Sequence, residues 1–325
     1  MFRRTFLPAL FLVACTSLRA DVTMRTSLNM KINVAVPGAL PELPFKEVVA
    51  RIKGDRSYSA IGTLVTVTDA SRSEVTLIDT KAQRYAILTL AEYMAKLQLN
   101  NLTPAASGSD QDKAEAAKAA EAAKQALANV KFDVESHETG RTDRIGGVAV
   151  FEREVVVNMS LPVPIPGQEN GMQMTMKLQV WKPNPSELDR MPALRELATY
   201  TERNQGFNNP AAMLRQIFSA MPGMSEGTSK LVEEMKKGGS VTLGMHMGFF
   251  MPGLAKMMEQ ARAQGNNIPD LPPADKPLAE MSLSLQELST DPVPNEVFAI
   301  PAGYKEAPAE DMLKSMMAML TGAKP

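Results

Sequence analysis

The chain has 325 residues, of which 44% are hydrophobic, 22% are charged and 23 are methionine. Its formal net charge is −1, and removal of residues 1–20 with their three arginines leaves 32 basic and 36 acidic residues, a charge of −4. This balance excludes the electrostatic footprint of a protein that binds nucleic acid or an anionic membrane. The single cysteine is Cys15, so the chain beyond residue 20 has neither a disulfide nor a reactive thiol.

The first twenty residues have the pattern of a secretion signal. Arg3 and Arg4 precede an apolar run over residues 6–15, which is too short to span a bilayer. Cleavage after Ala20 would release a chain that begins on the first predicted strand. In the alternative, residues 12–15 resemble a bacterial lipobox and Cys15 carries a lipid anchor. We therefore expect a periplasmic protein with no transmembrane segment in its mature chain, in one domain over residues 21–306.

A long strand follows the signal. From Val22 to Val36 every even position except Thr26 is apolar, whereas the odd positions are polar up to Asn33. This alternation predicts a strand with one wet face. Fifteen residues at ~3.3 Å each span about 50 Å, whereas a usual strand has only about five or six residues. We therefore expect a strongly curved antiparallel sheet with an apolar concave face.

Further strands are predicted from the same alternation or from short apolar runs. They cover residues 48–53, 61–68, 74–79, 84–90, 148–161, 172–180, 241–249 and 281–285. Strands and helices do not alternate regularly, which favours an α+β fold over a doubly wound sheet.

Helical segments lie between and after these strands. An Ala-rich stretch over residues 105–130 predicts an exposed helical insertion, because it carries few large apolar side chains. Amphipathic helices are predicted over residues 187–203, with an interruption near Pro192, and from Asn209, Pro252 and Pro308 onward. The last of these forms a C-terminal helix over residues 307–325. Helices would cover the concave face of the sheet.

Several turn and strand motifs are similar to those of one known group. They are Lys53-Gly54-Asp55-Arg56, Thr76-Leu77-Ile78-Asp79 with Lys81 and Tyr85, Thr139-Gly140, Ile145-Gly146-Gly147, Trp181, and residues 297–304. This set resembles exported bacterial domains of unknown function that are related to the LolA and LolB lipoprotein carriers. The resemblance implies a LolA-like half-barrel of antiparallel strands, with helices as a lid over a hydrophobic groove, and it transfers no catalytic residue.

Methionine is frequent on the predicted strand faces, where branched residues have the higher propensity. A flexible thioether surface suits an irregular apolar ligand, so one interpretation is a groove that binds a lipid or acyl chain. Its candidate residues are Met24, Leu28, Met30, Met174, Met176, Met245 and Met247 on strands, with Met257 and Met316 on covering helices. The equally favoured interpretation is a structural or signalling envelope module, whose methionines fill its own core and which contacts protein partners.

Motifs for chemistry are weak. Met245-His246-Met247 suggests soft-metal binding to copper, but alternate strand residues point to opposite faces. Residues 223–227 match the G-x-S-x-G pattern, although Ser225 is better explained as the start of a helix. His137 lies in a polar stretch and is expected to be solvated. We therefore predict a non-enzymatic protein without a catalytic residue, cofactor or metal.

Overall fold

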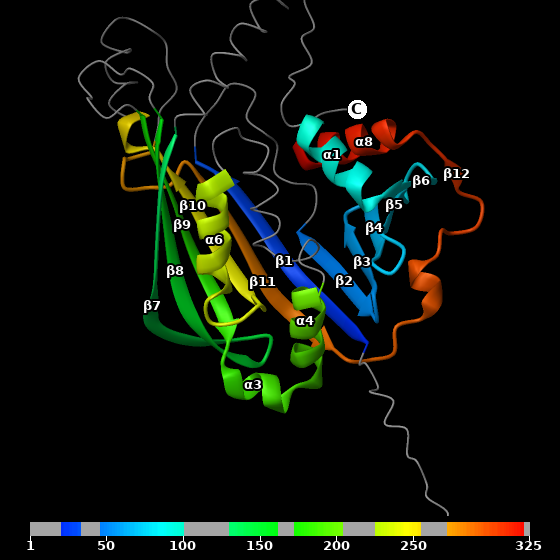
Figure 1. The fold of residues 1–325 in the computed structure, drawn as a ribbon, viewed down its shortest axis with the longest axis horizontal. Coiled ribbons are helices and arrows are strands. Elements are labelled where there is room, and N and C mark those ends of the chain that lie inside the picture. Colours follow the sequence, from blue (N-terminus) through cyan, green and yellow to red (C-terminus); the bar gives the residue numbers. More distant parts are fainter. Residues whose placement is uncertain are drawn as a thin grey trace, which may run out of the picture.

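A computed structural model describes residues 21–33, 46–100, 130–161, 172–203, 225–254 and 272–321. Within these ranges twelve strands form one open sheet, and every strand pair is antiparallel except the pair of β12 and β6. The helices α1, α4, α6 and α8 lie over the sheet (Figure 1). The α+β class expected from the sequence is confirmed.

One half of the sheet is a meander of short strands. It consists of β2 (Glu47–Lys53), β3 (Arg56–Ile61), β4 (Leu64–Asp69), β5 (Glu74–Asp79) and β6 (Arg84–Thr89), with the two-residue β12 (Lys305–Glu306) at its edge. The predicted strand over residues 61–68 is in fact parts of two strands. Gly62, with φ +58°, turns the chain between β3 and β4 in a conformation that suits glycine.

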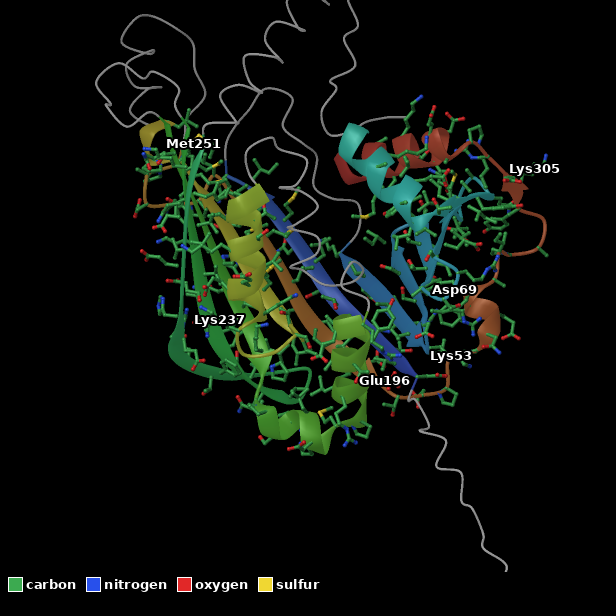
Figure 2. All side chains as sticks on the ribbon, viewed as in Figure 1. Lys53, Asp69, Glu196, Lys237, Met251 and Lys305 are labelled. Carbon is green, nitrogen blue, oxygen red and sulfur yellow. The ribbon has the colours of Figure 1, made fainter. Side chains whose placement is uncertain are left out.

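The other half contains longer strands. It consists of β7 (Lys131–Ile145), β8 (Val148–Leu161), β9 (Met172–Pro183), β10 (Gly244–Phe250) and β11 (Ala279–Ser289). The two halves meet at β1 (Val22–Ile32), which pairs with β2 on one side and β11 on the other. Met251, after β10, and Lys305, in β12, lie at opposite sides of the molecule (Figure 2).

The helices pack on one face through apolar side chains. α6 (Ser225–Lys236) contacts β7 and β8, whereas α1 (Leu90–Asn100) and α8 (Ala309–Thr321) cover β5 and β6. α3 (Pro185–Arg190) and α4 (Pro192–Arg203) replace the single interrupted helix predicted there, and the break at Pro192 is confirmed. The 3-10 helix η1 (Asn295–Phe298) contacts β3, and Phe298 packs against the same apolar cluster of β4 and β5 as Tyr58 and Tyr85.

The expected strong curl of the sheet, and with it the half-barrel, is wrong. The sheet is neither closed nor strongly curled, and its strand order runs from β12 to β7 without a return pairing. The described part of β1 has 11 residues, and its register shifts between Arg25 and Thr26. A bulge and ordinary strand twist accommodate a strand of this length without closure. The Ala-rich insertion, the helix expected from Asn209 and most of the one from Pro252 lie outside the described residues.

Candidate functional site

The predicted apolar wall lies on the helix-covered face, across the middle of the sheet. Side chains of directly paired residues in antiparallel strands project to the same face. Two rows therefore cross β1, β11 and β10 side by side: Met30, Met281 and Met247, and next to it Leu28, Leu283 and Met245. The candidates predicted from the sequence include two residues of each row, and the register adds Met281 and Leu283 of β11 between them.

Three of the predicted methionines are fully buried. Met176, Met245 and Met247 have exposed fractions of 0%, 2% and 4%, and they share a cluster with Leu231 and Met235 of α6. At these positions the thioethers fill the space between α6 and the sheet. They are core residues of the sheet–helix packing.

The wall continues past α6 as a less covered surface. Leu28, Met30, Met281 and Leu283 are half-buried, and we call these four residues the central strip. Met281 and Leu283 pack against the edge of the α6 cluster, whereas Leu28 and Met30 do not belong to it. Among the described helices, α6 lies over the longer strands beyond the strip, and α4 lies over the opposite end of β1 (Figure 1). The central strip is therefore an apolar surface between two described helices.

The other predicted residues do not join the strip. Met24 packs against the cluster beneath α4, and Met174 packs at the margin of the α6 cluster. Met316 belongs to α8 and packs against β5 and β6, at the far end of the sheet. Met257 lies outside the described residues.

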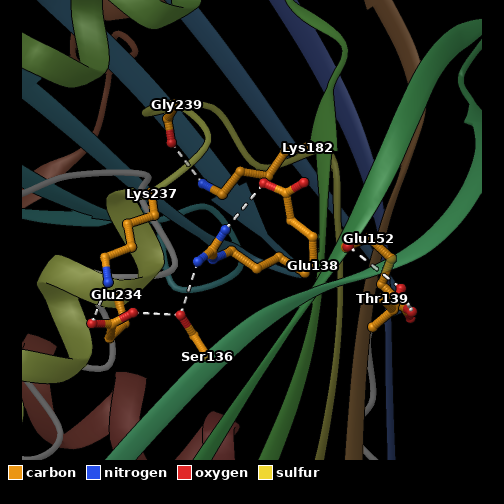
Figure 3. Close-up of polar contacts among 9 residues, drawn as sticks. Ser136, Glu138, Thr139, Glu152, Lys182, Glu234, Lys237 and Gly239 are labelled. Atoms are coloured by element: carbon orange, nitrogen blue, oxygen red, sulfur yellow. Dashed lines mark hydrogen bonds and ion pairs between the residues drawn. The ribbon is translucent and has the colours of Figure 1, made fainter.

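A buried lysine, which the sequence did not suggest, anchors the loop after α6 to the sheet (Figure 3). Lys182 is only 1% exposed, and its Nζ donates a hydrogen bond to the carbonyl oxygen of Gly239 at 2.6 Å. Burial, with a smaller contribution from the charge of Arg153, lowers the pKa of Lys182 to about 8. The alternation of β9 could have indicated the burial of Lys182, because this residue falls in phase with the inward-facing Leu178 and Val180.

A second part of this cluster ties α6 to β7 and β8. The guanidinium of Arg153 donates to Oγ of Ser136 at 3.0 Å, and Ser136 donates to a carboxylate oxygen of Glu234. Lys237 pairs with the same carboxylate at 2.7 Å, and hydrogen bonds from Lys237 and Ser136 lower the pKa of Glu234. The cluster positions α6 over the sheet, and Arg153, the cation at its centre, is buried.

The remaining motifs are not arranged for chemistry. His246 faces away from Met245 and Met247, since its paired neighbours Gln179 and Ser282 lie on the opposite face. α6 begins at Ser225. His137 is exposed, with its Nε2 3.9 Å from a carboxylate oxygen of Glu154. In the described ranges no three His, Cys, Asp or Glu side chains are grouped to hold a metal ion.

Comparison of the chain with protein-family models gives no match, and comparison with curated proteins gives none either. In the part of the chain that the structure describes, no helix has both the length and the apolar character needed to cross a membrane.

Proposed function

We propose that this protein is a non-enzymatic protein of the bacterial cell envelope that binds an apolar chain, a lipid or an acyl group, along the central strip. The observation that carries this proposal is the half-buried state of four paired apolar side chains next to a fully packed core. Exported location is supported by the signal pattern of residues 1–20. The turn and strand motifs that resemble those of the LolA and LolB relatives point to the same ligand class, but the half-barrel that they imply is not formed, so the proposal rests on the central strip.

The strip suits such a ligand physically. Met30 and Met281 have unbranched, flexible side chains that adjust to an irregular hydrocarbon surface. Each CH₂ group that leaves water contributes about 0.8 kcal/mol, so a long acyl chain can bind without a polar anchor. α8 is not a removable lid in this proposal, because Met312 and Leu313 are buried against β5 and β6.

The alternative is a structural or signalling module whose apolar face is filled permanently by its own residues and which binds protein partners. The full burial of Met176, Met245 and Met247 beneath α6 favours it. Under this alternative the central strip is core as well. A copper site from Met245, His246 and Met247 is not proposed, because the three side chains do not converge.

The test uses the mature chain, residues 21–325, purified from a periplasm without detergent. Mass spectrometry of its organic extract should find a stoichiometric lipid, and the emptied protein should bind a fluorescent fatty acid. Met30→Gln with Met281→Gln should weaken that binding at least tenfold, corresponding to about 1.4 kcal/mol. Asn29→Gln, on the other face of β1, is the matched control.

The free energy of unfolding of two methionine variants distinguishes the ligand-binding proposal from the structural alternative. If the strip is a ligand surface, Met30→Ala costs the empty protein less than about 1 kcal/mol, whereas Met176→Ala in the core costs about 2–5 kcal/mol. An empty extract together with no fatty-acid binding overturns the proposal. So does a Met30→Ala cost as large as that of Met176→Ala.

A further inference from the structure

A cleft of about 440 Å³, with no residue of the described helices in its lining, lies between the tip of the β7–β8 hairpin and the strands β9 to β11. The registers place Trp181, Gly244 and Ser284 in one row and His246 and Ser282 in the next, all on the face opposite the apolar wall. Asp143 and Arg144 of the hairpin form the facing side. The volume falls within the ~300–1,000 Å³ of small-molecule sites.

Gly244 makes room for the aromatic part of this cleft. A Cβ at this position would lie 2.8 Å from Cδ1 of Ile145 and 3.2 Å from Cδ1 of Trp181. Only glycine therefore lets the hairpin tip and the indole approach β10 without a shift. The sole tryptophan of the chain is held at the cleft as a flat, half-buried ring.

The polar groups of the floor are free to bind a ligand. Among the described residues, the side chains of Trp181, His246, Ser282 and Ser284 make no hydrogen bond with the protein. They offer an indole N–H, an imidazole and two hydroxyls, which can donate and accept hydrogen bonds in alternation.

The charges of the wall do not favour an ionic ligand. Arg144 and Asp143 are neighbours of opposite sign, and Arg144 already donates to the carbonyl oxygen of Gly147 at 2.8 Å. The cleft thus has no excess charge to select a phosphate or a carboxylate. A sugar ring combines an apolar C–H face, which packs on an indole, with hydroxyls that both donate and accept. We propose that this cleft binds an uncharged carbohydrate of one or two sugar residues.

The emission of Trp181 reports on this site directly, because the chain contains no other tryptophan. The mature protein is titrated with glucose, N-acetylglucosamine and their β-1,4-linked dimers, with inorganic phosphate and laurate as comparison ligands. At least one sugar should change the emission saturably. Ser282→Ala with Ser284→Ala should weaken that binding about tenfold, since two hydrogen bonds of about 0.5–1.5 kcal/mol each are removed.

Thr175→Ala, on the same face of β9 but distant from the cleft, is the control and should bind the sugar unchanged. Calorimetry of Trp181→Phe provides a readout without the fluorophore and should show weaker binding. Three results would each overturn the proposal: no saturable response to any sugar, equal affinity of the double serine variant, or a response to phosphate in place of sugar. Laurate binding that survives the serine substitutions concerns the central strip, so the two proposals fail separately.

Discussion

The buried charge of Lys182 makes stability depend on pH in an unusual direction. An unfolded lysine keeps its proton up to a pKa of 10.5, whereas the folded one releases it at about 8. Raising the pH through this window removes a charge that burial penalises, so the folded state gains stability. Linkage gives a gain of about 2 kcal/mol between about pH 7 and pH 9.5.

Urea unfolding at several pH values measures this gain. Lys182→Met keeps the length of the side chain and removes the titration, so the wild type should gain about 2 kcal/mol more than the variant between the two pH values. Other groups titrate in both proteins and cancel in the comparison. Tyr93, whose pKa burial raises to about 12, lowers the stability of both proteins at higher pH, so stopping at pH 9.5 keeps its contribution to each separate curve small.

Parallel stability curves for the two proteins would refute this reasoning, because they would mean that Lys182 titrates as a solvated lysine. The variant also loses the hydrogen bond to Gly239. That loss shifts its stability by the same amount at each pH, about 1–3 kcal/mol, and does not affect the difference.

Two further predictions concern tight packing and a buried anion. A Cβ on Gly227 of α6 would lie 2.3 Å from Cγ of Phe132. Gly227→Ala should therefore lower the free energy of unfolding in urea by about 1–3 kcal/mol, although alanine has the better helix propensity. The control Glu233→Ala, on the exposed side of α6, should change it by no more than about 0.5 kcal/mol. Glu152 is 1% exposed and pairs with Arg141 from the bent part of β7. Arg141→Ala leaves this buried carboxylate without its cation, so it should lower the free energy of unfolding by at least about 2 kcal/mol. A loss below about 0.5 kcal/mol would show that water compensates the carboxylate.

The sequence predicted strands well where one face is apolar. The bounds of β5 and β8 agree with the predicted ranges, and β1 starts at Val22 as expected. It did not predict β7, because most of its 15 residues are polar and exposed at the sheet edge. It also missed α1, which begins directly where β6 ends, so no apolar period separates the two.

The candidate site was predictable only in part, because residue types are local and register is not. Alternation correctly separated His246 from Met245 and Met247. It did not show that α6 would bury Met247 while Met30, two strands away in the same row, stays half-buried. Nor could it place the hairpin tip beside Trp181, since that contact depends on the turn at Gly146 and on the bend of β7.

The central position of β1 has a consequence for how the chain reaches its native state. Its partner β11 is far away in sequence, and the bond from Oγ of Ser27 to the carbonyl oxygen of Ser284 spans 257 positions. Each half of the sheet contains hairpins between consecutive strands, and these can form before the rest of the chain is available for folding. The seam between the halves can close only when almost the whole polypeptide is present. Such long-range closure slows folding, so β1 should be among the last strands to acquire its full set of partners.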